Sequence, residues 1–343
     1  MARAALLLCA LLVAAPASAA EPAWGADLSS WPAIAEQHPD FDPVSTWAEA
    51  GGTWIRVRLF HTSRHAHGRR DQARRLTARA REHGLKVVVA LHLSDTWADP
   101  GRQEIPPAWR GLGPDALADS VSAYVGSITR DLGDRIDAVQ IGNEIDAGIL
   151  LPHGSFTAGG AVPLLRAAAA GVDPAVPIVL HFSGQDEGHV AAARVAALDA
   201  AGVRFDVVGL SWYPWWHGDH TALRRALDRV ARTAVDRRLW VVESSYPFTL
   251  GWDDDVHNPV GAVEHVGAGP PATPDGQREW FGILAGVVGA HPATDTLFVW
   301  EPAWLAGDAP GSPWENLAWF DFDGTPLPAW NLLPGTAPGP TKE

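Results

Sequence analysis

Two glutamates follow short apolar runs, at the points where buried parallel strands would end. Residues 138–142 lead into Asn143 and Glu144, and residues 240–242 lead into Glu243. In barrel and doubly wound α/β folds, the carboxyl ends of parallel strands carry the active site. Two carboxylates there suit glycoside hydrolysis, one as general acid and then base, the other as nucleophile of a retaining enzyme. A retaining pair lies ~5–5.5 Å apart and an inverting pair lies further apart, a difference that sequence leaves open.

Other polar side chains could complete such a site. The amide of Asn143 could bind a sugar 2-hydroxyl, an interaction that strengthens in the transition state. Arg56 and Arg58 alternate with apolar residues, so both face one side of a strand. We expect Arg56 to lie beside the nucleophile, whereas Arg58 is either a site residue or a structural ion-pair residue. The pKa of Glu144 should be raised in an apolar cleft, and that of Glu243 lowered by the arginine.

Aromatic and polar groups are also combined after other apolar runs, as sugar binding requires. His92, Asp95 and Trp97 follow the third run, His181 ends the fifth, and Tyr213 follows the sixth. The chain contains 17 tryptophans but only 3 tyrosines. Tryptophan offers a flat apolar face and one donor, which suits the C–H faces of sugars. Many of them must be core residues, so their excess, rather than any single one, indicates a carbohydrate ligand.

Apolar runs and amphipathic helices alternate along the chain, which predicts a parallel sheet with helices outside it. Eight strands are expected, at 25–28, 53–59, 86–92, 138–142, 178–181, 207–211, 240–243 and 296–300. Helices are expected at 71–83, 115–131, 187–201, 221–235 and 274–289, the last capped by Thr273 with Pro274 in its first turn. The pattern predicts a single (β/α)₈ barrel domain over residues 21–333.

Two long loops follow the seventh and eighth expected strands, at 251–271 and 306–322. Long loops on the carboxyl side of barrel strands build the substrate cleft. The segment 334–343 is rich in Pro and Gly, and we expect it to be a disordered tail.

Residues 1–20 predict a secretory signal peptide. Arg3 supplies the positive start, residues 4–15 are apolar but too short to span a membrane, and Ala17-Ser18-Ala19 is a cleavage site, with the cut near Ala19 or Ala20. An uncleaved N-terminal anchor is the alternative. The single cysteine lies within this segment, so the mature protein should have no disulfide.

The formal net charge of −14 argues against nucleic acid or an anionic membrane as a partner. It is compatible with a neutral substrate, and we expect a secreted monomer. No phosphate-binding loop or nucleophile-elbow serine is found, and the paired-carboxylate chemistry requires no cofactor.

Several motifs resemble the family 53 glycoside hydrolases, the arabinogalactan endo-β-1,4-galactanases. The similarity runs in order from about residue 24 to 330. It is carried by Gly25-Ala-Asp27, Ile55-Arg-Val-Arg58, His92-Leu-Ser-Asp-Thr-Trp-Ala-Asp-Pro100, Gly142-Asn-Glu144, Gly209-Leu-Ser-Trp-Tyr-Pro214, Val241-Val-Glu243 and Trp300-Glu-Pro-Ala-Trp304.

The resemblance implies a retaining barrel with Glu144 as acid/base and Glu243 as nucleophile. It also implies a substrate-binding set, which is Asp27, Arg56, His92, Asp95, Trp97, Asn143, His181, Tyr213 and Trp300. The implied substrate is the β-1,4-galactan side chain of pectin, cut internally to galacto-oligosaccharides.

The resemblance further implies that the loop after the seventh strand could hold a structural calcium ion. Bacterial members carry Asp-x-Asp-x-His-x-Asn there, and this chain has Asp253, Asp255 and His257 at that spacing, with Asn258 one position early. Ligands from the next loop, such as Ser312 or Glu315, could join loops seven and eight through the ion. The alternative is an acidic turn without metal.

His61, His65 and His67 form a second cluster of candidate metal ligands. Their spacing matches no standard zinc pattern and no nearby acid completes the set. We expect them to be solvated loop side chains.

Other functions are also compatible with the sequence. A barrel glycosidase of the same clan could act on a different β-linked polysaccharide, such as mannan or xylan. A polysaccharide-binding protein on an inactive barrel, or a calcium-dependent adhesion module, belongs to a different class. The presence of both glutamates argues against an inactive barrel.

Overall fold

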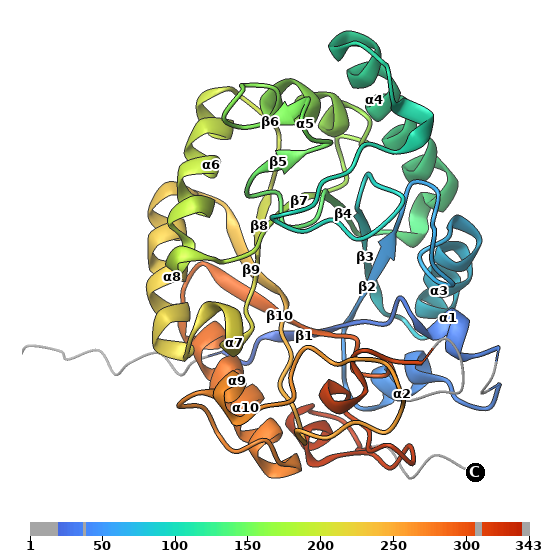
Figure 1. Ribbon diagram of the computed structural model, residues 1–343, viewed down its shortest axis with the longest axis vertical. Coiled ribbons are helices and arrows are strands. Elements are labelled where there is room, and N and C mark those ends of the chain that lie inside the picture. Colours follow the sequence, from blue (N-terminus) through green and yellow to red (C-terminus); the bar gives the residue numbers. More distant parts are fainter. Residues whose placement is uncertain (1–19, 37–38, 306–310, 338–343) are drawn as a thin grey trace, which may run out of the picture.

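Eight parallel strands close into a barrel in the order β1-β10-β9-β8-β7-β4-β3-β2. The computed structural model describes residues 20–36, 39–305 and 311–337. Figure 1 shows the strands around a common centre, with the long helices outside them. The strands are β1 (Ala23–Asp27), β2 (Trp54–Leu59), β3 (Lys86–Leu91), β4 (Ala138–Ile141), β7 (Ile178–Phe182), β8 (Val207–Ser211), β9 (Arg238–Glu243) and β10 (Thr294–Trp300). The predicted single-domain (β/α)₈ fold is confirmed.

All five predicted helices are present. They are α3 (Arg70–Glu82), α4 (Pro114–Leu132), α6 (His189–Ala200), α8 (His220–Thr233) and α10 (Pro274–Ala290). Thr273 caps α10 by accepting a hydrogen bond from the Gly276 N–H, with Pro274 in the first turn as expected. The sequence did not reveal α2 (Pro43–Glu49) or α5 (Ala161–Ala170). The first has only two turns, and the second is an alanine run without a clear polar face.

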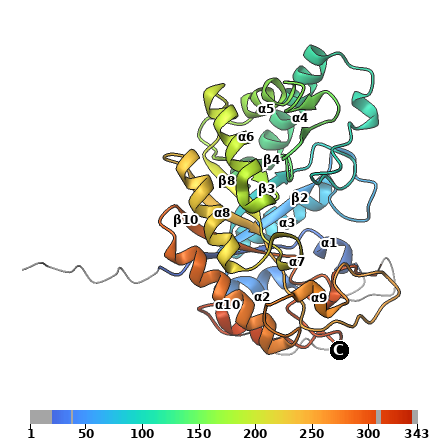
Figure 2. The same cartoon turned by 60° about the vertical axis from the view of Figure 1, so that its left-hand side comes forward.

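Shorter elements lie mainly in the connections. They are the helices α1 (Trp31–Ile34), α7 (Pro214–His217) and α9 (Val263–Val266), the hairpin strands β5 (Gly148–Ile149) and β6 (Gly154–Ser155), and the 3₁₀ turns η1 (Pro107–Trp109), η2 (Gly133–Arg135), η3 (Asp186–Gly188), η4 (Glu315–Leu317) and η5 (Pro328–Leu332). Figure 2 shows α7 beside α9, so the connections after β8 and β9 meet.

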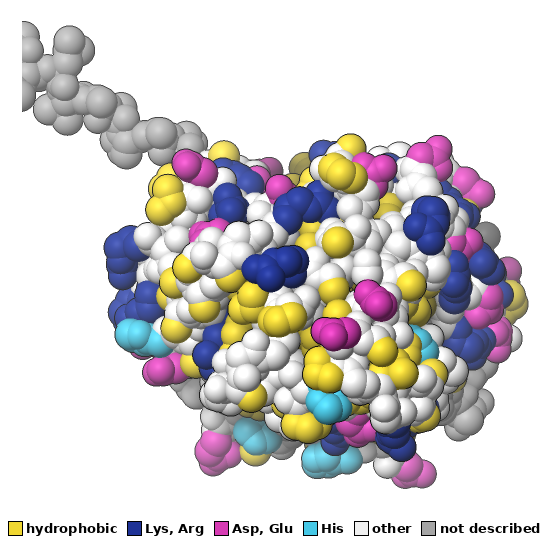
Figure 3. Space-filling model, turned by 90° about the horizontal axis from the view of Figure 1, so that it is seen from above, with side chains coloured by type: hydrophobic (Ala, Val, Ile, Leu, Met, Phe, Trp, Pro, Cys, Tyr) yellow, Lys and Arg dark blue, Asp and Glu magenta, His cyan; other side chains and the backbone are white. Residues whose placement is uncertain are grey.

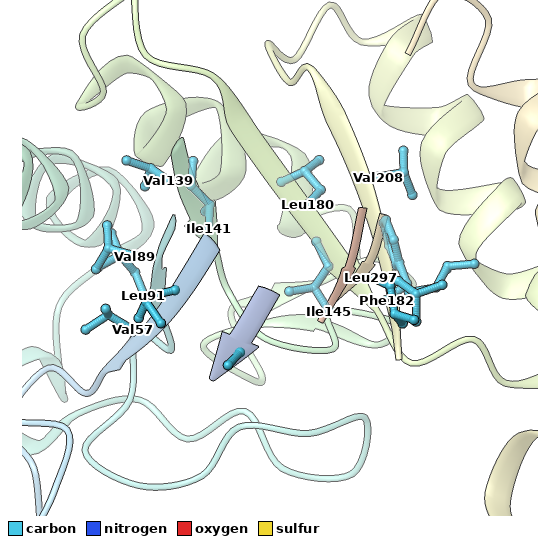
Figure 4. Packing of buried hydrophobic residues seen from close by; sticks show 14 of the residues in the cluster. Val57, Val89, Leu91, Val139, Ile141, Ile145, Leu180, Phe182, Val208 and Leu297 are labelled. Atoms are coloured by element: carbon cyan, nitrogen blue, oxygen red, sulfur yellow. The ribbon is translucent and has the colours of Figure 1, made fainter. Parts of the chain in front are cut away.

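The barrel strands are buried on both faces, and their side chains alternate between two apolar layers. On β2, Ile55 and Val57 belong to the main core, which lies between the strands and the helices, whereas Trp54 belongs to a separate interior cluster. Figure 4 shows part of the main core, in which Val57, Val89, Val139 and Leu180 come from neighbouring strands. Period-two alternation therefore directs Arg56 and Arg58 of the same strand into the barrel.

The interior cluster fills the barrel with aromatic rings. The ring centroids of Trp54 and Trp240 lie 5.1 Å apart, and that of Phe298 lies 5.9 Å from that of Trp240. Gly25 makes room for this packing, because a Cβ there would lie 2.3 Å from the Phe298 ring. The barrel is a packed core at this level, so a ligand can enter only above it.

The chain ends are described only in part. The predicted signal peptide lies outside the described residues except for Ala20, and the predicted tail is described only as far as Ala337. Within it, the Gly335 and Thr336 N–H groups donate to the carbonyls of Ala50 and Glu49. Among the described residues, no helix is both long and apolar enough to cross a membrane.

Candidate active site

The two predicted catalytic glutamates meet at the carboxyl end of the barrel. An oxygen of Glu144, an oxygen of Glu243 and a ring nitrogen of His181 all lie within 4.8 Å of one another. Gly142 and Glu144 both have positive φ, 74° and 44°, so the chain turns sharply as it leaves β4. A non-glycine residue in the left-handed region is strained, a feature that often marks functional sites. This turn places Glu144 at the barrel mouth, across from Glu243.

Glu243 is held by one donor from β2 and one from the connection after β8. Its Oε1 lies 2.8 Å from Arg56 Nη1, and its Oε2 accepts a hydrogen bond of 3.0 Å from the Tyr213 hydroxyl. Burial raises the pKa of Glu243 above its ordinary value, while Arg56 and Tyr213 act in the opposite direction. The prediction of a lowered pKa is therefore wrong, because the cost of burying the charge outweighs the attraction of the arginine.

Glu144 has the more strongly raised pKa of the two. Burial is the largest cause and the negative charge of Glu243 the second, while a hydrogen bond with Ser211 lowers it. The predicted direction is confirmed. Over a range of pH, Glu144 therefore keeps a proton to donate while Glu243 is ionised.

Arg56 organises the floor of the site with its whole guanidinium group. Nη1 binds Asp27 at 2.7 Å as well as Glu243, Nε donates to Gln140 at 3.0 Å, and Nη2 donates to Asn143 Oδ1 at 2.8 Å. All of these side chains are at least nine-tenths buried. Each of the three guanidinium nitrogens thus makes at least one contact, which fixes both Glu243 and Asn143, the residue before Glu144. Nothing in the sequence singles out Gln140, because a Gln within a strand usually has a structural role.

His181 lies fully buried beneath the cleft rather than on its wall. Its Nδ1 lies 3.0 Å from Asn143 Oδ1, and its Nε2 lies 2.8 Å from the hydroxyl of Ser211. Burial lowers the pKa of His181 far below its ordinary value, so the ring is neutral. Ser211 also hydrogen-bonds Glu243 at 3.4 Å, which makes it a site residue that the sequence did not identify.

A cavity of about 480 Å³ opens above this network. Predicted site residues that line it are His92, Trp97, Asn143, Glu144, Tyr213, Glu243 and Trp300. Asp27 and Arg56 lie below it with His181. Further aromatic lining comes from Trp216, Trp304 and Trp314, so the tryptophan excess serves the cleft as well as the core.

Two side chains on the wall keep a donor for a ligand. The Nδ1 of His92 accepts a 3.3 Å hydrogen bond from the Ala98 N–H, which leaves the proton on Nε2, a buried atom without a partner among the described residues. Burial lowers the pKa of His92, so the ring is neutral. The Asn143 amide donates once, to the Ala98 carbonyl at 2.9 Å, and one N–H remains. Both groups suit a sugar hydroxyl.

Asp95 does not join the site. Its carboxylate accepts a 2.9 Å hydrogen bond from the Thr62 N–H and lies 3.3 Å from Nδ1 of His61. It does not line the cavity. The motif around it is correctly placed, but this side chain ties the loop after β2 to the loop after β3.

The expectation that the three loop histidines are solvated is wrong. His65 and His67 line the cavity, and His67 is only 6% exposed. His61 packs against the rings of both Trp109 and Tyr124. Within the described part of the chain, these histidines form no group with metal-ligand spacing. Sequence spacing alone could not show that this loop folds back over the barrel mouth.

Arg58 forms a second buried ion pair next to Arg56. Its Nη2 donates to Glu301 at 2.9 Å, and its guanidinium lies over the Trp97 ring at 4.3 Å. Burial raises the pKa of Glu301 to about 7, although Arg58 opposes the shift. Glu301 follows β10, so three barrel strands end in or near a glutamate. The same strand-end pattern that marks Glu144 and Glu243 could have identified this third glutamate from the sequence.

The residues of the predicted calcium loop do not gather around one point. The only His/Asp/Glu group with metal-ligand spacing in the described chain is that of Glu144, His181 and Glu243. Loop seven, which follows β9, and loop eight, which follows β10, instead contact each other directly. Asp254 accepts from the Ser312 N–H at 2.6 Å, and Glu315 accepts from the Asp253 N–H at 2.6 Å. Asp255 and His257 are exposed and Asn258 is buried, so the described residues do not fit the expected ligand set.

Comparison with known proteins shows which family the chain belongs to. The model of glycosyl hydrolase family 53 matches residues 25–333. An arabinogalactan endo-β-1,4-galactanase of Cellvibrio japonicus is 28% identical over 310 residues, covering 83% of this chain and 81% of the relative. An uncharacterized protein from the bgaB 5′ region of Niallia circulans is 33% identical over 277 residues, covering 74% of this chain and 75% of the relative.

The solved family 53 catalytic domain of Ignisphaera aggregans has the same fold. The two structures superimpose with a TM-score of 0.87 at 28% sequence identity, and the match covers 93% of this chain and 97% of the Ignisphaera aggregans chain. Because the family model extends over nearly the whole barrel, the chain belongs to glycosyl hydrolase family 53.

Proposed function

We propose that this protein is a secreted, retaining endo-β-1,4-galactanase that cuts galactan side chains of pectin to galacto-oligosaccharides. The observation that carries the retaining mechanism is the short distance, within 4.8 Å, between oxygens of Glu144 and Glu243. Retaining pairs lie ~5–5.5 Å apart, whereas inverting pairs need ~6.5–9.5 Å to admit a water. The substrate is inferred from relatives named as galactanases.

In the first step, Glu144 protonates the glycosidic oxygen while Glu243 attacks the anomeric carbon. The bond to the leaving sugar breaks and a galactosyl–Glu243 ester forms. In the second step, the Glu144 carboxylate removes a proton from water, which attacks the same carbon and releases Glu243. Arg56 and Tyr213, both bonded to Glu243, orient the nucleophile throughout.

The walls of the cleft suit a neutral polysaccharide. Trp97, Trp300 and Trp304 line the cavity and offer apolar faces to sugar C–H groups. The free N–H groups of His92 and Asn143 can donate to hydroxyls. Neither the cleft nor the two steps require a cofactor.

Secretion and the way in which the two long loops are joined are separate parts of the proposal. Residues 1–20 support export, and mass spectrometry of protein secreted by a bacterial host should show a start at Ala20 or Glu21. For calcium, the contacts support direct hydrogen bonding of loops seven and eight, with the ion as the competing outcome.

The deciding experiment is hydrolysis of linear β-1,4-galactan followed by proton NMR. We expect the β-anomer to be the first product, before mutarotation. An initial α-anomer would contradict retention. Mannan and xylan assayed in parallel test the substrate, since release from one of these and none from galactan would point to another specificity. Binding of galactan without any hydrolysis that Glu243→Gln abolishes would point to a non-catalytic barrel.

A further inference from the structure

The loop after β2 builds one wall of the cleft with a pair of stacked histidines. The rings of His65 and His67 are nearly parallel, 5° apart, with centroids separated by 5.5 Å. His67 also contacts the rings of Trp97 and Trp304 at 5.5 and 5.4 Å. All four side chains line the cavity. The catalytic steps use none of the four.

The buried ion pair of Arg58 and Glu301 determines which nitrogen of His67 carries the proton. The Nη2 of Arg58 lies 3.3 Å from Nδ1 of His67. A guanidinium can only donate, so this Nδ1 must be the acceptor and the proton must lie on Nε2. That Nε2–H makes no hydrogen bond to any described residue. His67 therefore presents a neutral donor among aromatic rings, a combination that fits a sugar hydroxyl.

His65 supports the same arrangement from the outer side. Its Nε2 lies 3.0 Å from the hydroxyl of Thr96, which ties the histidine loop to the loop after β3. The Ser63 hydroxyl donates to the His67 carbonyl at 2.6 Å and accepts from the His65 N–H at 3.1 Å. The loop is thus fixed by its own hydrogen bonds, so its side chains are positioned before a ligand binds.

The position of this wall indicates which part of the substrate it meets. Trp304 follows β10, which lies directly opposite β4 in the eight-strand ring, and the histidines follow β2. Glu144, after β4, must reach the oxygen of the leaving sugar. The histidines lie midway between these two strands in the ring, and His67 packs against Trp304 with ring centroids 5.4 Å apart. His67 therefore shares the side opposite Glu144, which faces the sugars that stay attached to the nucleophile.

We propose that His65, His67, Trp97 and Trp304 form a subsite for one neutral sugar unit on the glycone side of the cleaved bond. The Nε2–H of His67 donates to a hydroxyl of that unit. Arg58 and Glu301 act as positioning residues, because they fix the ring without touching the sugar. This inference rests on the proposed function.

The test compares aryl β-1,4-galactosides whose glycone has one to four galactose units. In the wild type, kcat/KM should rise when the glycone becomes long enough to reach the subsite. We expect His67→Phe to reduce that rise about three- to tenfold, the effect of one neutral hydrogen bond. His67→Gln, whose amide nitrogen can replace Nε2, should restore most of it. His153→Phe, at an exposed histidine, is the control and should behave as wild type.

An equal loss at every glycone length would show that His67 is merely structural and would overturn the subsite. So would an undiminished rise in His67→Phe. A wild type that cleaves none of these galactosides and no galactan would instead overturn the proposed function itself, which distinguishes the two failures.

A second measurement covers the case in which His67→Phe does not fold. In inactive Glu243→Gln protein, ¹⁵N NMR should show His67 protonated on Nε2, and β-1,4-galactotetraose should shift this signal but not that of His153. A proton on Nδ1, or a His67 signal unmoved by the tetrasaccharide, would overturn the proposal.

Discussion

At the scale of single residues, the site separates two glutamates by their surroundings. Burial raises the pKa of both glutamates. For Glu243 the second-largest effect is the guanidinium of Arg56, which lowers its pKa, whereas for Glu144 the second-largest effect is the charge of Glu243, which raises its pKa further. The difference between the surroundings of the two glutamates, rather than a low pKa at either one, supports the proposed roles of Glu144 as acid and Glu243 as nucleophile. Two predictions test this assignment directly.

The first concerns the covalent intermediate. Glu144→Ala should lower kcat/KM on galactan by about 10²–10⁴-fold, since general acid–base help is lost. On an aryl galactoside with a good leaving group, added azide should restore turnover and give the β-galactosyl azide. The same azide added to Glu243→Ala is the comparison. An α-azide from Glu144→Ala would contradict its role as acid/base.

The second concerns pH. The proposed mechanism needs Glu243 ionised and Glu144 protonated, so activity should rise as Glu243 loses its proton and fall as Glu144 does. Because both pKa values are raised, both limbs of the kcat/KM profile should lie above the ordinary glutamate value of ~4.3. In Glu144→Gln, assayed on the activated aryl galactoside, the alkaline limb should disappear. Its persistence would assign that limb to another group.

At the scale of elements, loops position what the strands support. Loop seven contributes Pro259 to the cleft and loop eight contributes Trp314. They are joined through Asp254, which accepts from the N–H groups of Val256 at 2.7 Å and Ser312 at 2.6 Å. A carboxylate that accepts hydrogen bonds from backbone N–H groups of both loops can hold the two loops together, as a bridging metal ion would.

This contact predicts a contrast between neighbouring aspartates. Asp254→Ala should lower stability by about 1–3 kcal/mol, the cost of leaving its donors unpaired, and expose loop eight to proteolysis. Asp255→Ala, at an exposed position, should have little effect, and EDTA should hardly change the melting temperature. The reverse pattern, with sensitivity to Asp255→Ala and to calcium removal, would restore the calcium site.

The packed barrel interior yields a prediction at Gly25. Gly25→Ala would force a methyl group to within 2.3 Å of the Phe298 ring and should destabilise the protein by about 1–3 kcal/mol. Gly286→Ala in α10 is the matched control. No atom lies within 4 Å of a Cβ there, and alanine is the better helix former. Urea unfolding of both variants makes the comparison, and equal stabilities would show that the interior can relax.

At the scale of the whole molecule, charge and aromatic content serve different ends. The face in Figure 3 carries basic and acidic side chains intermixed, without one large field of a single sign. The formal net charge is −14, which favours solubility rather than the capture of a charged ligand. The tryptophans are divided between the two roles. Trp47, Trp319 and Trp330 pack together away from the cleft, whereas Trp97 and Trp300 line it.

Since galactan is neutral, its binding should not depend on long-range electrostatics. We expect KM on galactan to change less than about twofold between 0.05 and 0.5 M NaCl, a range over which the Debye length shortens severalfold. Acidic rhamnogalacturonan, assayed alongside, supplies the charged comparison. A steep salt dependence on galactan would indicate that a charged group takes part in recognition.

The sequence by itself determined the barrel and its two glutamates. Strands and helices are encoded by local periodicity. Glu243 is the last residue of a strand and Glu144 lies in the turn directly after one, so the neighbouring residues were enough to place both. The Arg56 position followed from the same alternation. These features depend on short-range pattern, and the structure confirms the fold and brings the glutamates together.

Only the tertiary structure decided the rest. Whether Asp95 faces the cleft, whether His67 is buried and whether Glu301 meets Arg58 depend on contacts between loops far apart in the chain. Glu243 shows the same limit, because the balance between burial and the Arg56 charge depends on how much water the folded site excludes. Long-range contact and desolvation are properties of the packed molecule, and no stretch of sequence read alone contains them.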